Sequence, residues 1–211
     1  MRDKLLLSAA MLAATLSVPG TAAAGFVLDT GTPTGTGAPV VLDTAQFLAG
    51  EFAVTAGETI TELSAFLTQG VGQPGDTFTF DIYSNTGFTS RPSSRPAPVF
   101  TATGTFTANG WNSTAVDLST LSSGDYWLAL QVASTTNTKG LDAPLESSTL
   151  TGTAPALAFA FAGSSGQYAL STSTPIGLEV TATTPVPLPA SLWLLIGGIA
   201  GLGAFGRRSR R

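Results

Sequence analysis

Carboxylates are the only side chains in this sequence that offer familiar catalytic chemistry, because it contains no histidine and no cysteine. A Ser-His-Asp triad, a thiolate nucleophile and an ordinary zinc site are therefore excluded. A glycosidase needs only two carboxylates, and the candidate pairs are Asp76 with Asp81 and Glu58 with Glu62. Asp81 falls on the polar face of a predicted strand and Glu58 lies beside a predicted turn. We therefore expect solvated surface charges, no catalytic residues and no cofactor.

Two further residue types bear on binding. Asp142 and Glu146, in the predicted loop 140–147, come nearest to a calcium ligand set, but the D-x-D-x-D-G spacing is missing and we predict no metal site. Tryptophan rings stack on the apolar faces of sugars. Trp127 lies in a strongly apolar run and is predicted to be core. Trp111 follows the turn signal Asn109-Gly110; we favour a core position, with a partly exposed sugar contact as the alternative.

The charge balance of the middle of the chain is strongly acidic. Between Gly25 and Ala190 the only cations are Arg91, Arg95 and Lys139. The acidic residues of the same stretch are Asp29, Asp43, Glu51, Glu58, Glu62, Asp76, Asp81, Asp117, Asp125, Asp142, Glu146 and Glu179. This excess argues against a nucleic acid partner and against docking on an anionic lipid surface.

The elements that would position these residues are short strands. Phe78, Phe80 and Ile82 alternate with threonine and aspartate, which is the clearest two-residue period in the chain. Similar apolar or alternating runs recur between turn signals. They are Gln46–Val54, Thr59–Leu67, Asp76–Tyr83, Val99–Phe106, Trp111–Leu118, Gly124–Val132, Leu157–Phe161, Tyr168–Leu170 and Ile176–Val180.

This spacing predicts an all-β fold, a single jelly-roll-like β-sandwich over residues 45–183. Residues 25–44 are rich in Gly, Thr and Pro and are predicted to form an extended arm or loop. The sandwich is flanked by a signal helix in residues 1–24 and by a hydrophobic helix in the C-terminal segment 184–211.

The N-terminus has the layout of a secretory signal peptide. Basic Arg2 and Lys4 precede the apolar run Leu5–Leu16, and Ala22, Ala23 and Ala24 provide a small-x-small cleavage site before Gly25. An uncleaved anchor is the alternative, but twelve helical residues span about 18 Å against a hydrocarbon core of about 30 Å. We therefore expect export through the Sec translocon and cleavage by signal peptidase.

The C-terminus has three parts in a fixed order. A short motif comes first, then the uncharged run Leu192–Phe205, which spans about 21 Å as a helix, then a cluster of arginines. By the positive-inside rule the arginines stay in the cytoplasm, as the exported domain requires. The motif consists of Val186, Pro187, Leu188, Pro189, Ala190 and Ser191, and the stop signal of Arg207, Arg208, Arg210 and Arg211.

The tail resembles the PEP-CTERM family of C-terminal sorting signals, in the variant with a V-P-L-P-A core. The resemblance covers about 26 residues and implies a Gram-negative bacterium that makes exopolysaccharide. It also implies recognition by an exosortase, a membrane-embedded cysteine protease or transpeptidase. Leu188 stands where the commoner form has glutamate, so recognition through that carboxylate is not implied. The alternative is a C-terminal membrane anchor that nothing processes.

The middle of the chain has a second resemblance. Its stretches Q-F-L-A-G-E-F-A-V, P-G-D-T-F-T-F-D-I-Y-S and L-S-S-G-D-Y-W-L-A-L are similar to the choice-of-anchor extracellular β domains. That similarity implies a jelly-roll module without an established enzymatic role.

Together these observations predict a secreted, non-enzymatic protein. We expect it to be held transiently in the inner membrane by its C-terminal helix, then processed and released to the cell surface or exopolysaccharide matrix. A carbohydrate-binding module or weak glycosidase acting on that matrix is the first alternative. An unprocessed tail-anchored envelope protein is the second.

Overall fold

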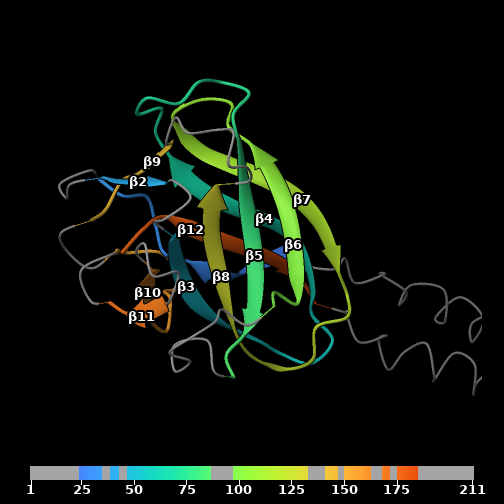
Figure 1. Cartoon of the computed structure of the whole chain (residues 1–211). Coiled ribbons are helices and arrows are strands. Elements are labelled where there is room, and N and C mark those ends of the chain that lie inside the picture. Colours follow the sequence, from blue (N-terminus) through green and yellow to red (C-terminus); the bar gives the residue numbers. More distant parts are fainter. Residues whose placement is uncertain are drawn as a thin grey trace, which may run out of the picture. The chain divides into compact units, whose positions relative to one another are not determined.

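All regular secondary structure in the described part of the chain is β-strand (Figure 1). The computed structural model describes residues 24–34, 39–42, 47–86, 97–132, 141–146, 150–162, 168–171 and 175–184. These residues belong to one compact unit, Ala24–Thr184. The predicted all-β class is confirmed, whereas both predicted terminal helices lie outside the described residues.

The strands form two large antiparallel sheets and one small one. The first sheet has four strands in the order β1 (Ala24–Asp29), β12 (Leu178–Thr183), β4 (Thr59–Leu67) and β7 (Gly110–Leu118). The second has six, in the order β11 (Tyr168–Leu170), β10 (Phe159–Ala162), β3 (Phe47–Val54), β8 (Gly124–Val132), β5 (Thr77–Ser84) and β6 (Phe100–Thr105). A separate ribbon pairs β2 (Val40–Leu42) with β9 (Leu141–Ala143).

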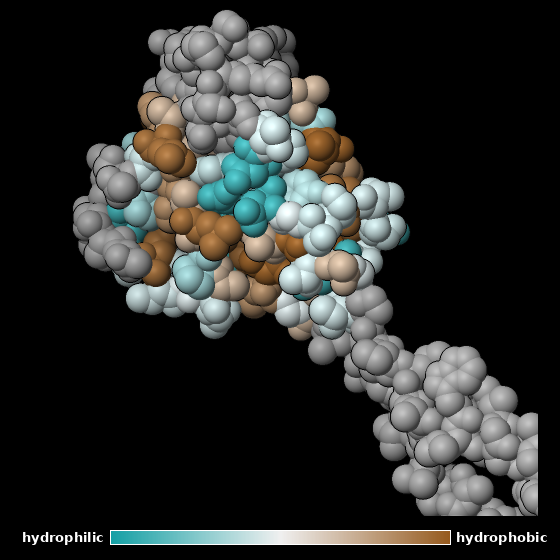
Figure 2. Space-filling view, turned by 90° about the horizontal axis from the view of Figure 1, so that it is seen from below, coloured by the Kyte–Doolittle hydropathy of each residue, from teal (hydrophilic) through white to brown (hydrophobic). Residues whose placement is uncertain are grey.

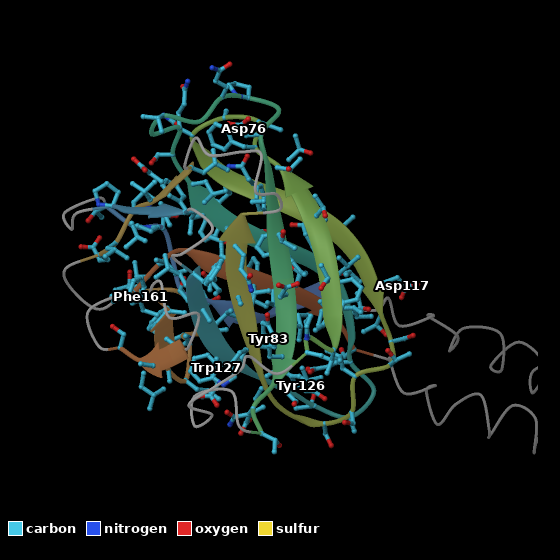
Figure 3. The ribbon with its side chains drawn as sticks, viewed as in Figure 1. Asp76, Tyr83, Asp117, Tyr126, Trp127 and Phe161 are labelled. Atoms are coloured by element: carbon cyan, nitrogen blue, oxygen red, sulfur yellow. The ribbon has the colours of Figure 1, made fainter. Side chains whose placement is uncertain are left out.

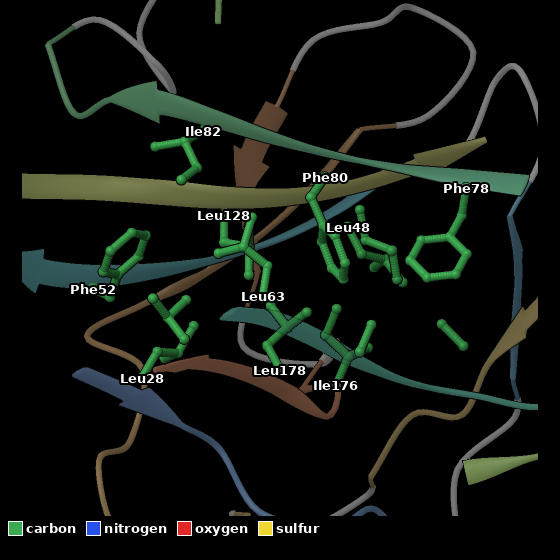
Figure 4. Close-up of a cluster of buried hydrophobic side chains, with 14 of the residues drawn as sticks. Leu28, Leu48, Phe52, Leu63, Phe78, Phe80, Ile82, Leu128, Ile176 and Leu178 are labelled. Atoms are coloured by element: carbon green, nitrogen blue, oxygen red, sulfur yellow. The ribbon is translucent and has the colours of Figure 1, made fainter. Parts of the chain in front are cut away.

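The hydrophobic core lies between the two large sheets. Figure 4 shows Phe52, Phe80 and Leu128 of the six-stranded sheet together with Leu63 and Leu178 of the four-stranded sheet. All five side chains are 0–1 % exposed. Burial of each such side chain contributes about 1.5–3 kcal/mol, so the shared core holds the two sheets as a β-sandwich.

A second apolar cluster lies on the opposite face of the six-stranded sheet. Its buried members are Phe47, Ala49, Tyr83, Trp127, Ala129, Ala160 and Ala162. The central strands of this sheet are therefore buried on both faces. This explains why the run Tyr126–Val132 is almost continuously apolar, and it confirms the prediction that Trp127, 1 % exposed, is a core residue.

Three strands were not predicted from the sequence: β1, β2 and β9. β1 begins at Ala24, the last residue of the predicted signal helix, and continues into the predicted arm 25–44, which also contains β2. The predicted loop 140–147 contains β9. β2 and β9 have three residues each, too few to show a period, and each exists because the other completes its hydrogen bonds. Asn109 does lie in a bend and Gly110 begins β7, but this segment links β6 of one sheet to β7 of the other and does not close a hairpin.

The two-sheet core predicts a large difference between two leucine-to-alanine substitutions. Leu128 is fully buried and Leu157 is 61 % exposed. We expect Leu128→Ala to lower the free energy of unfolding by about 2–5 kcal/mol, because a cavity remains in the packed core. Leu157→Ala should change it by less than about 1 kcal/mol. Urea denaturation of both variants measures the difference, and equal losses would contradict the placement of the core.

Candidate functional site

The two carboxylate pairs considered from the sequence are not assembled. Asp76 Oδ2 accepts a hydrogen bond from the Gln73 backbone N at 2.7 Å and closes the turn before β5, whereas Asp81 lies in the middle of that strand. Five strand residues span about 16 Å, beyond the roughly 5–9.5 Å between glycosidase carboxylates. Figure 3 shows Asp76 at the opposite end of the domain from Tyr83 and Trp127. Asp76 and Asp81 therefore cannot act on one glycosidic bond.

Glu58 and Glu62 are separated in the same way. Glu58 Oε2 accepts from the Thr55 backbone N at 2.7 Å and closes the β3–β4 turn. Glu62 lies in β4, opposite Thr181 of β12 and Ala115 of β7. Glu58 thus belongs to a turn and Glu62 to the middle of a sheet, and the two do not form a carboxylate pair.

Asp81 is buried, not solvated as its place on a polar strand face suggested. It is 8 % exposed, and its Oδ1 accepts from the Thr101 hydroxyl at 2.5 Å. Tyr83 OH donates to Asp81 Oδ2 at 3.4 Å and accepts from Gln131 Nε2 at 3.1 Å. The prediction that Asp81 is a solvated charge was wrong, because the face of β5 that carries it lies against the second apolar cluster.

The structure brings together three other carboxylates, Asp29, Glu62 and Glu179, on the outward face of the four-stranded sheet. Asp29 lies directly opposite Glu179, and Glu62 opposite Thr181, two residues further along β12. Asp29 accepts from the Gly31 backbone N at 2.9 Å, and from the Thr153 backbone N at 2.8 Å and hydroxyl at 2.6 Å. Sequence spacing could not reveal this cluster, because its members lie on three strands, β1, β4 and β12, that are far apart in the chain.

Electrostatics distinguishes the members of this cluster. Burial, followed by the charges of Asp29 and Glu62, raises the pKa of Glu179. Burial also acts to raise the pKa of Asp29, but the hydrogen bonds from Thr153 and Gly31 outweigh it and lower that pKa. The described residues include eleven carboxylates and no lysine, arginine or histidine, so no cation among them offsets this repulsion.

A second carboxylate pair, Glu51 and Asp125, lies on the neighbouring strands β3 and β8. Glu51 is opposite Trp127, and Asp125 is two residues away from Trp127 along β8. Diagonal neighbours of this kind are about 7–8 Å apart between Cα atoms. Burial, followed by the charge of Asp125, raises the pKa of Glu51. Glu51 and Asp125 are therefore a second pair of electrostatically coupled carboxylates, on the face of the six-stranded sheet that carries Trp127.

Asp142 and Glu146, the candidate calcium ligands, have separate partners. The backbone of Asp142 pairs with Thr68 through hydrogen bonds of 2.8 and 3.0 Å, and burial raises the pKa of its carboxyl group. Glu146 is 5 % exposed and its Oε2 accepts from the Thr34 backbone N at 2.8 Å and from the Thr34 hydroxyl. Among the described residues, no three histidine, cysteine, aspartate or glutamate side chains gather as a metal-binding group.

Trp111 is not a core residue, although a core position was the favoured prediction. It is half-buried and pairs edge-to-face with Phe66, with ring centroids 5.7 Å apart and an interplanar angle of 85°. Its Nε1 donates to the Thr32 hydroxyl at 3.2 Å. Along β7 the even-numbered residues Asn112 and Leu118 are buried and point into the protein. Trp111 and Ser113, at odd-numbered positions, therefore lie on the outward face of the strand. The outward position of Trp111 thus follows from the alternation of side chains along a strand.

Hydroxyl and carboxylate groups lie beside this aromatic pair. Along β4 and β7, the row next to Phe66 and Trp111 consists of Ser64 and Ser113, whose Oγ atoms are 2.9 Å apart. Ser64 Oγ also donates to Glu62 Oε1 at 3.3 Å. The aromatic pair therefore borders a polar row that ends at the carboxylate cluster.

The surface of the domain mixes polar and apolar residues. Figure 2, seen from below relative to Figure 1, shows hydrophilic residues gathered near the centre of this face with hydrophobic residues around them. The exposed large hydrophobic residues of the described chain include Leu157 and Leu170, at 61 % and 66 % exposure.

The predicted processing sites are only partly within the described residues. Ala24 and Gly25 begin β1, where they lie opposite Thr183 and Ala182 of β12. Ala22, the motif Val186–Ser191 and the four terminal arginines lie outside the described residues. Within the described ranges, no helix has the length and hydropathy needed to span a membrane.

Compared with protein-family models and with curated proteins, the chain matches none.

The raised pKa values predict that the domain becomes more stable as the solution is made mildly acidic. Glu179, Glu51 and Asp142 bind protons more readily in the folded than in the unfolded chain. Stability therefore rises as the pH falls from 7 through their folded pKa values toward the ordinary values, 4.5 for glutamate and 3.8 for aspartate. Asp29 acts in the opposite direction, but only below its ordinary value of 3.8.

Thermal unfolding at pH 7 and pH 5 tests this prediction. We expect a higher melting temperature at pH 5 for the unmodified domain. Glu179→Gln should raise the melting temperature at pH 7 and reduce the gain on acidification, whereas Asp117→Asn, at an exposed position of β7, should leave the gain intact. A domain that loses stability between pH 7 and pH 5 would contradict the assignment.

Proposed function

We propose that this chain is a secreted, non-enzymatic surface or exopolysaccharide-matrix protein. It is exported with a cleavable signal peptide, held in the inner membrane by its C-terminal segment, and processed by an exosortase-type enzyme. The signal peptide, the V-P-L-P-A motif and the arginine cluster Arg207–Arg211 are the sequence features that support this proposal.

The structural observation in its favour is the pairing of the first and last strands. Ala24 lies opposite Thr183, so the chain enters and leaves the domain at the same end of the same sheet. The proposed signal peptide ends at Ala24, and the sorting motif begins at Val186, after Thr183. Adjacent chain ends of this kind are compatible with a domain whose two flanking segments reach one membrane.

The proposal includes a jelly-roll arrangement of the sandwich. The chain changes sheets between β3 and β4, β4 and β5, β6 and β7, and β7 and β8. Such repeated crossing between two antiparallel sheets is typical of jelly rolls. The role is structural or adhesive, and the acidic domain surface favours neutral or cationic matrix components over anionic ones.

Intact-mass measurement of the protein from a host that encodes an exosortase tests the sorting proposal. We expect a mature chain that begins at Gly25 and has lost Arg211. Replacing both Pro187 and Pro189 by alanine should leave the tail attached, whereas the control Pro185→Ala, outside the motif, should be processed normally. If the unmodified mature protein keeps Arg211, the tail is a permanent anchor and the sorting proposal is wrong.

Carbohydrate binding is the second candidate function, and the Phe66–Trp111 pair favours it. The pair lies on an outward sheet face beside the exposed hydroxyl of Ser113, so that an aromatic ring and a hydrogen-bonding group are within reach of the same sugar, whereas Ser64, the partner of Ser113, is itself buried. Glu51 and Asp125 are the carboxylates to examine if the domain also hydrolyses the polymer.

Glycan-array binding by the unmodified domain and two Trp111 variants tests this second function. Trp111→Ala removes the ring and should abolish binding. Trp111→Phe keeps a ring but removes the hydrogen bond to Thr32, and it should retain most of the binding. If Trp111→Ala binds as strongly as the unmodified domain, the aromatic pair serves only to hold Thr32. Sugar release lost in Glu51→Gln or Asp125→Asn would instead assign a glycosidase.

A further inference from the structure

We infer that β6 is an open sheet edge through which two copies of this chain associate, by antiparallel pairing of β6 with the same strand of the second copy. This surface is separate from the carboxylate cluster and from the Phe66–Trp111 pair. Neither export nor sorting is needed for this association, because it depends only on the edges of the two sheets.

One side of the β6 backbone is paired with β5, and no described strand pairs with the other side. β6 is the last strand of the six-stranded sheet (Figure 1). The Phe106 backbone N donates to the carbonyl of Asp76, just before β5, at 2.8 Å, so the even-numbered residues of β6 direct their N–H and C=O groups toward β5. The backbone groups of Thr101, Thr103 and Thr105 therefore face the free edge. The side chains of these three threonines are exposed.

The other three edges of the two large sheets each carry a feature that hinders pairing with another chain. β1 has the extra residue of a register shift between Phe26 and Leu28, and β7 has one opposite Ile60–Glu62. β7 also carries the exposed Asp117, and β11 has only three residues. Bulges, charges and short length are the usual protection of edge strands. β6 has six residues in unbroken register with β5, and none of them is charged or proline.

The residues of β6 make a second copy of the same strand a suitable partner. A two-fold axis requires a surface that is complementary to itself. With the axis at Thr103, Thr101 of each copy lies opposite Thr105 of the other, and all three edge-facing residues pair. Opposed threonines are among the favourable cross-strand pairs. This pairing brings no like charges together, whereas pairing through β7 would bring Asp117 of both copies into the interface.

The inward side of β6 gains burial from the same pairing. Phe100 and Ala102 pack against the main core but are only partly buried. A strand added beside β6 covers the outer flank of both side chains. Gly104 is already buried, and a Cβ at its position would collide with the Phe78 ring. The association therefore buries apolar surface in addition to pairing the free backbone groups.

Sedimentation of the full chain, Met1–Arg211, tests the association. A mild detergent keeps the apolar ends of the chain from associating. A single added strand pair buries less than the roughly 1,600 Å² of a standard interface, so we expect a weak dimer. Its dissociation constant should be on the order of 100 µM. A chain that stays monomeric up to about 1 mM would overturn the inference.

Two lysine substitutions separate the β6 edge from other contacts. Thr103→Lys places like charges at the proposed two-fold axis and should weaken dimerisation at least tenfold. Ala115→Lys places the same charge at an exposed position of β7 and should leave dimerisation unchanged. Both positions are exposed, so both variants should keep the thermal unfolding midpoint of the unmodified chain. Dimerisation of Thr103→Lys at the unmodified strength would show that β6 is not the interface.

Single cysteines read the register directly, because the chain has no cysteine of its own. Opposite residues of a hydrogen-bonded pair have Cα atoms about 5.5 Å apart, within the range that a disulfide bridges. Oxidised Thr103→Cys should therefore form a disulfide-linked dimer, and a mixture of Thr101→Cys and Thr105→Cys should form a mixed dimer. Ala115→Cys is the matched control and should link at least tenfold more slowly than Thr103→Cys. If Thr103→Cys links no faster than this control, the proposed edge is wrong.

Discussion

The rest of the structure depends on the insertion of β12 between β1 and β4. β12, the last strand of the domain, joins β1 to β4, and its alternate residues Leu178, Val180 and Ala182 point into the core. Thr30 reinforces the junction, because its hydroxyl donates to the Ile176 carbonyl at 2.7 Å and accepts from the Leu178 backbone N at 2.8 Å. Contacts between such distant residues make this a high-contact-order fold that is completed late. The same pairing places both ends of the domain side by side.

A second constraint is the lack of cations in the described residues. Buried carboxylates normally need a partner, and here hydroxyl and backbone N–H groups take that role. Thr153 donates to Asp29, Thr101 to Asp81 and Thr34 to Glu146. Hydrogen bonds to charged groups contribute about 1.5–3 kcal/mol each, so neutral partners suffice for an isolated carboxylate. They do not suffice where carboxylates gather, as the raised pKa of Glu179 illustrates. The threonine-rich composition of the chain thus has a direct electrostatic role.

The sequence predicted a strand correctly where apolar and polar residues alternate regularly, or where both faces of the strand are apolar. The alternation of Phe78, Phe80 and Ile82 predicted β5, and the apolar run before Val132 predicted β8. The sequence did not predict the burial of a side chain correctly where the residue type or its place in the alternation differs from what covers it in the fold. Asp81 follows the polar alternation of its strand but is buried, since a second apolar cluster covers that face. Trp111 was placed in the core on hydrophobicity, yet its position in the alternation of β7 turns it outward.

The sequence by itself determined the all-β class, most strand positions and the exclusion of histidine and cysteine chemistry. The export and sorting signals at its ends are predictions of the same local kind. These are local properties, since residue type, two-residue periodicity and the order of short motifs can be read without knowing which segments meet. Only the tertiary structure decided which carboxylates gather, that Asp81 is buried and that Gly25 pairs with Ala182. Such pairings depend on which strands become neighbours, and that choice is set by burial of the whole core rather than by any short stretch of sequence.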